Sequence, residues 1–200
     1  DLLLDDLLNS DLNIVDPDGR KLFIKYVEIN DSVTNRHSLH SLKDKKNLVG
    51  VEIGTNQGKN SLNILENLNI EKLYLIDPYI PYDHFTKVAL NWWKQDSYEI
   101  LREFTHKIVR IEKKSSDCVD EIPNNLDFVY IDGNHNINFV KKDIELYSKK
   151  IKSDGLLCGH DFENKHVFAS VVDFCIENNK QLFFSDTDDH GVSKDWWIIK

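Results

Sequence analysis

Residues 50–58 read Gly-Val-Glu-Ile-Gly-Thr-Asn-Gln-Gly, and residues 73–77 read Leu-Tyr-Leu-Ile-Asp. The first stretch predicts a strand that runs into a glycine-bearing turn, with a helix from about Gly58. The second predicts another strand, which ends on the carboxylate of Asp77. In an open parallel sheet this pair builds a nucleoside pocket, because glycines let the backbone approach the ligand and the acid accepts bonds from ribose hydroxyls. We therefore expect a nucleoside-bearing cofactor.

The turn itself has the spacing acid-x-Gly-x-Asn-x-Gly. Asn56 stands where a third glycine is expected, and asparagine tolerates left-handed backbone dihedrals better than most residues. On the glycines alone, a purely structural turn with a buried acid is an equal alternative, but Asp77 favours the pocket. The predicted cofactor-binding residues of this region are Glu52, Gly54, Thr55, Asn56, Gly58 and Asp77.

Strand-like and helical patterns alternate from Leu48 to the end of the chain. Strands separated by helices predict crossovers and a parallel sheet. Residues 186–195 are too short and polar for a helix, so the last two strands should form an antiparallel hairpin. We predict an α/β fold, with a doubly wound, seven-stranded, mostly parallel sheet that ends in this hairpin. The predicted strands are Leu48–Ile53, Lys72–Ile76, Lys107–Ile111, Leu126–Ile131, Gly155–Cys158, Gln181–Phe184 and Trp196–Ile199, and the predicted helices are Lys59–Leu68, His84–Thr105, Asn138–Lys150 and His166–Asn178.

The first 46 residues differ in character from the rest. Leu22–Ile29 is β-rich or a short helix, and the following residues 31–47 are polar. We expect residues 1–46 to form a cap over the domain or, as the alternative, a partner-binding arm. Residues 47–200 are predicted to form the cofactor-binding domain.

Two further strands are predicted to end on acids. Asp132 opens the segment Asp-Gly-Asn-His, which places His135 three residues later, and Asp161 follows the run at 155–158. The carboxyl ends of neighbouring parallel strands meet at one edge of a sheet, so we expect these side chains to lie close together. Two adjacent carboxylates repel unless a proton or cation lies between them, and oxygen ligands favour Mg²⁺, Ca²⁺ or Mn²⁺. The alternative is that one aspartate caps a helix or binds the cofactor while the other pairs with a lysine.

Composition excludes several classes of function. The formal net charge is −9, whereas sequence-independent binding to nucleic acid needs a basic face. No apolar run reaches the roughly 18 residues of a membrane span, and no signal peptide is visible. Three widely spaced cysteines indicate free thiols in a reducing compartment, so we expect a cytoplasmic protein without nucleic-acid or membrane partners. The oligomeric state stays open, a homo-oligomer included.

Together these residues resemble the class I methyltransferases that use S-adenosylmethionine, over about residues 48–200. The turn Glu52–Gly58 is similar to that family's first motif, Asp77 to its ribose-binding acid, and the ending Trp196–Ile199 to its antiparallel last strand. The segments 132–135 and 159–162 resemble the narrower methyltransferase-24 group, which includes metal-dependent O-methyltransferases of macrolide sugars.

That resemblance implies specific roles. Asp132 and Asp161 would hold Mg²⁺ and His135 would be the general base. The sequence does not identify the third protein ligand, for which Glu163 is a candidate. Asp132 and Ser116 would also contact the cofactor. The acceptor would be a small hydroxylated molecule, such as a sugar or glycoside.

Three alternatives to this hypothesis remain at the level of sequence. The first is a metal-independent methyltransferase of the same fold, in which Asp132 and Asp161 contact cofactor and substrate directly. The second is a nicotinamide-dependent oxidoreductase, which the missing middle glycine and the closing hairpin disfavour. The third is a non-catalytic binding domain that kept the fold.

Overall fold

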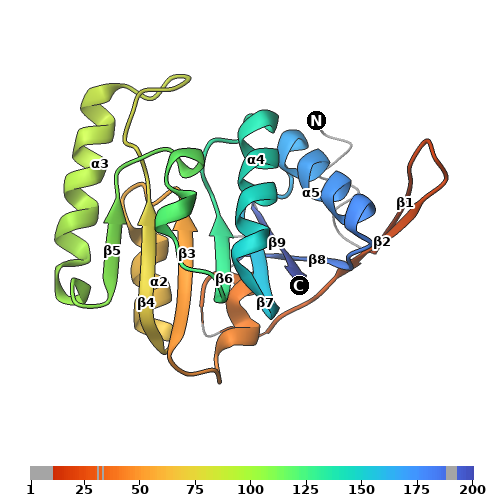
Figure 1. Ribbon diagram of the computed structural model, residues 1–200, viewed down its shortest axis with the longest axis horizontal. Coiled ribbons are helices and arrows are strands. Elements are labelled where there is room, and N and C mark those ends of the chain that lie inside the picture. Colours follow the sequence, from red (N-terminus) through yellow and green to blue (C-terminus); the bar gives the residue numbers. More distant parts are fainter. Residues whose placement is uncertain (1–10, 31, 33, 188–192) are drawn as a thin grey trace.

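The computed structural model of the chain describes residues 11–30, 32, 34–187 and 193–200. These residues form one nine-stranded sheet in the order β1-β2-β8-β9-β7-β6-β3-β4-β5 (Figure 1). The strands are β1 (Leu12–Val15), β2 (Lys21–Tyr26), β3 (Leu48–Ile53), β4 (Ile70–Ile76), β5 (Ile108–Ile111), β6 (Leu126–Ile131), β7 (Ile151–Gly159), β8 (Leu182–Asp186) and β9 (Lys194–Ile199).

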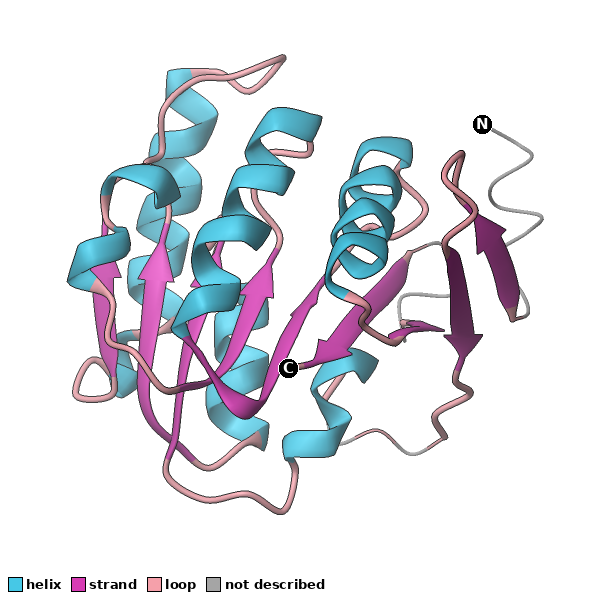
Figure 2. Cartoon of the chain, turned by 45° about the vertical axis from the view of Figure 1, so that its right-hand side comes forward, coloured by secondary structure: helices cyan, strands magenta, loops and turns pink. Residues whose placement is uncertain are grey.

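Helices cover both faces of the sheet (Figure 2). The α-helices are α2 (Lys59–Asn67), α3 (Lys87–Ile100), α4 (Ile137–Tyr147) and α5 (Lys165–Asn178). Short 3₁₀ helices are η1 (His37–Leu42), η2 (Arg102–Phe104), η3 (Ser115–Asp117), η4 (Val119–Glu121) and η5 (Ser148–Lys150). None of the helices in these ranges is both long and apolar enough to cross a bilayer.

The core consists of two hydrophobic clusters, one on each face of the sheet. One cluster joins α4 and α5 to Val51, Ile53 and Val129, and the other joins α2 and η1 to Phe128 and Tyr130. Neighbouring residues of β3 and β6 therefore point to opposite faces, as strand geometry requires. Because both faces are covered, the central parallel strands read as nearly continuous apolar runs, which is the pattern that predicted them.

The prediction of seven strands was wrong, because β1 and β2 extend the sheet. They form an antiparallel pair, and β2 adds to β8 in parallel. Leu22 and Ile24 are buried while Lys21 and Phe23 are exposed, so β2 buries only one set of alternate side chains. Because this alternation of buried and exposed residues is short, the sequence alone did not distinguish a strand from a short helix here. The last two strands, β8 and β9, pair antiparallel, and β9 also pairs antiparallel with β7.

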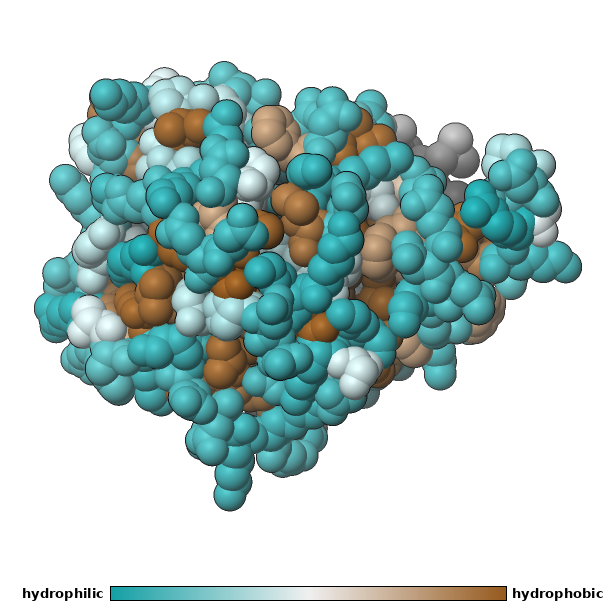
Figure 3. Space-filling view, in the orientation of Figure 1, coloured by the Kyte–Doolittle hydropathy of each residue, from teal (hydrophilic) through white to brown (hydrophobic). Residues whose placement is uncertain are grey.

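Figure 3 shows the face that α4 and α5 cover, where hydrophilic residues predominate and hydrophobic ones appear between them. A hollow of about 580 Å³ lies between these two helices, with Ile144, Leu157 and Ile198 among its lining residues. Its lining also includes Ser148 and Asn178, at the C-terminal ends of α4 and α5. Part of this hollow therefore lies near the amino ends of the parallel strands.

A buried carboxylate connects η1 to the sheet. Asp195 of β9 is fully buried and accepts bonds from the Ser38 backbone N–H (3.1 Å), the Ser38 hydroxyl (2.6 Å) and the Tyr130 hydroxyl (3.1 Å). Thr34, Ser38 and Leu39 are buried as well. The segment 34–42 is thus held against the middle of the sheet by polar bonds that water does not reach.

We expect Asp195→Ala to lower the free energy of unfolding by about 3 kcal/mol, because it leaves three buried donors without a partner. The matched control is Asp173→Ala, which removes an exposed ion pair with Lys141 and should cost less than about 1 kcal/mol. Urea unfolding of both variants measures the difference. Equal losses would show that the Asp195 bonds do not anchor η1.

Candidate functional site

The turn between β3 and α2 has a left-handed backbone at three positions. The φ angles are +93° at Gly54, +48° at Asn56 and +78° at Gly58. Asn56 thus adopts the left-handed conformation that asparagine tolerates better than most residues. Asn56 is held there by Asp77, whose Oδ2 accepts its backbone N–H at 2.9 Å.

Asp77 braces the loop that follows β4 as well. Its Oδ1 accepts the backbone N–H of Tyr79 at 2.8 Å, and the Tyr79 hydroxyl donates to the Asn56 carbonyl at 2.8 Å. Burial raises the pKa of Asp77, and the two backbone bonds oppose that effect. Both oxygens retain lone pairs, so this carboxylate can still accept bonds from a ligand.

Gly54 allows the ends of β3 and β6 to come together. A Cβ at this position would overlap the backbone carbonyl of Asp132. The Gly54 N–H donates to the Ile76 carbonyl and the Asp132 N–H donates to the Ile53 carbonyl, both at 2.8 Å. The three strand ends therefore meet at one point of the sheet edge.

A cavity of about 500 Å³ opens beside this point, which is large enough for a cofactor-sized ligand. Five predicted cofactor-binding residues line it: Gly54, Asn56, Asp77, Ser116 and Asp132. The remaining wall includes Tyr82, Trp93, Phe139 and Asp143. Asp143 is buried and accepts a bond from the Ser115 hydroxyl, and burial raises its pKa to about 6.

The other three predicted cofactor-binding residues do not line this cavity. Thr55 is buried, and Gly58 immediately precedes α2. Glu52 is 1% exposed and lies beneath the turn, where it accepts bonds from Asn60 (2.9 Å) and from the Ser61 hydroxyl. Burial raises the pKa of Glu52 to about 7, although these two bonds partly offset it. The side chain points toward α2 because Val51 and Ile53 occupy the opposite face.

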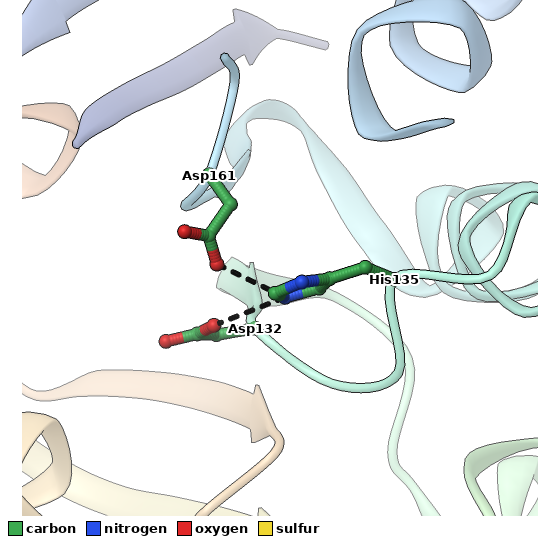
Figure 4. A group of neighbouring side chains, drawn as sticks. All are labelled: Asp132, His135 and Asp161. Atoms are coloured by element: carbon green, nitrogen blue, oxygen red, sulfur yellow. Dashed lines mark ion pairs between the residues drawn. The ribbon is translucent and has the colours of Figure 1, made fainter. Parts of the chain in front are cut away.

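Asp132, His135 and Asp161 come together at the carboxyl ends of β6 and β7, as expected (Figure 4). His135 Nε2 lies 2.9 Å from Asp161 Oδ2 and 3.8 Å from Asp132 Oδ1. One ligand atom from each residue falls within 4.8 Å of the others. Asp132 also lines the cavity, so the cluster and the cavity share a wall.

A protonated His135 ring places a positive charge between the two carboxylates. Hydrogen bonds with Asp132 and Asp161 raise the pKa of His135 to about 10. Burial raises the pKa of Asp161, but bonds from His135 and His160 outweigh it and lower that pKa overall.

The same donor set fits a small divalent cation. The two carboxylates suit Mg²⁺ or Mn²⁺, with water or substrate completing the shell. Glu163, the candidate third ligand, accepts the backbone N–H of Lys194 at 2.9 Å and lies outside this group of three.

One residue near the cluster carried no signal in the sequence. Arg36 Nη1 lies 2.8 Å from His160 Nε2, and His160 Nδ1 lies 3.3 Å from Asp161 Oδ2. Arg36 belongs to the N-terminal segment, so only the folded chain brings it to this edge of the sheet.

Gly54→Ala should lower the free energy of unfolding by about 3 kcal/mol or more, since it combines an unfavourable φ with a clash against backbone. Gly19→Ala is a matched control, because Gly19 has φ +80° and nothing within 4 Å of an added Cβ. That control should cost only about 1 kcal/mol. Chemical unfolding distinguishes the two, and similar costs would mean that the β3–β6 approach tolerates a side chain.

Glu52 should make stability fall between about pH 4.5 and 7. Its pKa in the folded protein is raised from 4.5 to about 7, so the folded state binds the proton more tightly, and ionisation at higher pH disfavours it. Glu52→Gln should therefore gain about 3 kcal/mol relative to the wild type between pH 4 and pH 8. Urea unfolding at both pH values measures this, with exposed Glu66→Gln as the control. Parallel pH profiles of Glu52→Gln and wild type would contradict it.

Comparisons with solved structures show the same fold in methyltransferases. The precorrin-6y C5,15-methyltransferase of Geobacter metallireducens has a TM-score of 0.61 at 13% identity, covering 82% of this chain and 85% of that one. An rRNA methylase of Streptococcus thermophilus has a TM-score of 0.62 at 10% identity, covering 87% and 99%. A putative caffeoyl-CoA O-methyltransferase of Staphylococcus aureus has a TM-score of 0.56 at 18% identity, covering 76% of each chain.

Sequence comparisons show the family of the chain in addition to its fold. An uncharacterised protein of Acanthamoeba polyphaga mimivirus is 27% identical over 126 residues, which are 60% of this chain and 54% of that protein. The match thus spans about half the length of the curated relative. A sequence model of the family described as "Methyltransferase domain" matches residues 51–162, which are more than half of the chain and contain Gly54, Asp77, Asp132, His135 and Asp161. The fold implies S-adenosylmethionine as the cofactor, and the chain belongs to this methyltransferase domain family.

Proposed function

We propose that the chain is an S-adenosylmethionine-dependent O-methyltransferase that acts on a hydroxyl group of a small molecule, a sugar or glycoside, with a divalent cation. The observation that carries the proposal is the position of Asp132, which belongs both to the cavity wall and to the cluster with His135 and Asp161. A methyl donor in the cavity and a hydroxyl at the cluster would therefore be neighbours.

The residues of the cavity bind and orient the donor. Asp77 accepts bonds from the ribose hydroxyls, and the turn at Gly54 and Asn56 lets the backbone lie against the ligand. Ser116 lines the same cavity and would contact the cofactor. Alignment accounts for most of the catalysis, because the sulfonium is already reactive and the transfer needs an in-line geometry.

His135 prepares the acceptor. It takes the hydroxyl proton as the new oxygen–carbon bond forms and the sulfur–carbon bond breaks, and S-adenosylhomocysteine leaves. Asp132 and Asp161 would hold the cation. When bound, the cation supplies two effects, stabilising the negative charge that develops on the acceptor oxygen and neutralising the carboxylates that otherwise keep His135 protonated.

The charge of the chain favours a small acceptor over RNA. One structural neighbour is an rRNA methylase, but a net charge of −9 repels a phosphate backbone. The ion pairs that His135 makes with both aspartates also support a second candidate, a metal-independent methyltransferase in which the imidazole alone balances these carboxylates.

We expect Asp77→Ala to weaken S-adenosylhomocysteine binding by about 10- to 100-fold, because it removes hydrogen bonds to a charged acceptor. His135→Ala should keep this affinity within about twofold and lose turnover by at least about 100-fold. Calorimetry with S-adenosylhomocysteine measures the first effect. Transfer of a labelled methyl group to a panel of methyl glycosides, with Mg²⁺, measures the second.

Exposed Asp120→Ala is the control and should match the wild type in both assays. A wild-type chain that binds no S-adenosylhomocysteine would overturn the proposed function. Full turnover after exhaustive chelation would select the metal-independent candidate, and full turnover by His135→Ala would remove His135 as the base.

A further inference from the structure

Arg36 reaches the candidate site from outside the part of the chain that matches the family. The match begins at residue 51, whereas Arg36 immediately precedes η1. Its backbone is fixed locally, because its carbonyl accepts the Thr34 hydroxyl at 2.6 Å and the Leu39 N–H at 3.0 Å. Two residues later, Ser38 binds the buried carboxylate of Asp195. The guanidinium therefore projects from a well-anchored segment.

The chemistry of these side chains determines which group donates each hydrogen bond between Arg36, His160 and Asp161. A guanidinium carries only donors and stays charged, so Arg36 Nη1 must donate to His160 Nε2 across their 2.8 Å separation. Nε2 of His160 is then unprotonated. The ring proton lies on Nδ1, which faces Asp161 Oδ2 at 3.3 Å and donates to it. Arg36 thus selects the tautomer of His160 that has a donor on the Asp161 side.

The contacts that run from Arg36 through His160 end at the carboxylate of Asp161. Its Oδ2 receives His160 Nδ1 from one side and His135 Nε2, at 2.9 Å, from the other. Its backbone has φ +53°, an uncommon conformation for aspartate, and its carbonyl accepts the Asn164 N–H at 2.9 Å. Backbone and side chain of Asp161 are both constrained, and its Oδ1 is not engaged by either histidine.

We propose that Arg36 and His160 are positioning residues, which hold the Asp161 carboxylate toward His135 and the bound cation. This inference rests on the proposed function for the role of the cation, but the hydrogen-bond order itself needs no ligand. The N-terminal segment would then be part of the catalytic unit, and the matched family region alone would have an incomplete site. Residues that orient the ligands of a metal by hydrogen bonds typically contribute about 10- to 100-fold in metal affinity.

The first test is NMR of the full chain labelled with ¹⁵N-histidine, without metal. The His160 ring should show a protonated Nδ1 and an unprotonated Nε2, with its signals assigned by their loss in His160→Asn. In Arg36→Met the fraction of this tautomer should fall, because only the 3.3 Å contact with Asp161 then favours it. A protonated Nε2 in the wild type would overturn the proposal without any variant.

The second test is Mn²⁺ binding, followed by electron paramagnetic resonance. Arg36→Met should bind Mn²⁺ about tenfold more weakly, and Arg36→Lys should recover part of the loss because it retains a charged donor. Affinity for S-adenosylhomocysteine should stay within about twofold. Exposed Arg102→Met, which removes only a surface pair with Glu99, is the matched control.

The outcomes separate this inference from the proposed function. Equal Mn²⁺ affinities of wild type and Arg36→Met would overturn the positioning role and leave the function standing. A wild type that binds no Mn²⁺ would remove the cation from the function, whereas the NMR result still decides whether Arg36 and His160 orient Asp161. If Arg36→Met fails to fold, the Mn²⁺ affinity of Arg36→Lys and the His160 tautomer of the wild type test the proposal instead.

Discussion

Two carboxylates at the ends of adjacent parallel strands impose the main physical constraint on this molecule. Asp132 follows β6 and Asp161 follows β7, and both reach His135. Such a pair repels unless a proton or a cation lies between its members. A protonated His135 supplies such a charge, and the same oxygen atoms suit a divalent cation. The polar architecture of this edge of the sheet follows from that requirement.

The close packing of backbone at the sheet edge makes the cavity possible. Gly54 has no side chain, so β3 can contact the Asp132 carbonyl, and the turn can expose its backbone to a ligand. Asp77 then holds the next position of the turn through the Asn56 N–H. The cavity and the acidic cluster share these strand ends, so in the proposed function the methyl donor and the acceptor hydroxyl would be neighbours.

Residues 11–46 contribute more than an extension of the sheet. The β1–β2 pair adds to β8, while η1 packs against β7, β8 and β9 and is held by Asp195. Arg36 emerges from this anchored segment and reaches the cluster through His160. Side-chain contacts from this segment cross the predicted boundary at residues 46–47. Residues 1–10 of the predicted N-terminal segment lie outside the described residues.

The sequence by itself determined the strand–helix alternation, the turn at Gly54 and Asn56, and the grouping of Asp132, His135 and Asp161. These features follow from local rules, since apolar runs mark strands and the carboxyl ends of parallel strands share one edge. The alternation of side chains along a strand also determines the orientation of Glu52. Its neighbours Val51 and Ile53 point to one face of the sheet, so the Glu52 side chain points to the other face, away from the cavity.

Only the tertiary structure decided the pairing of β2 with β8 and the approach of Arg36 to His160, which are 124 residues apart. It also brought Asp143 of α4 into the cavity wall beside Ser115. Contacts of this kind depend on how whole elements dock, and no periodicity within a single segment encodes that.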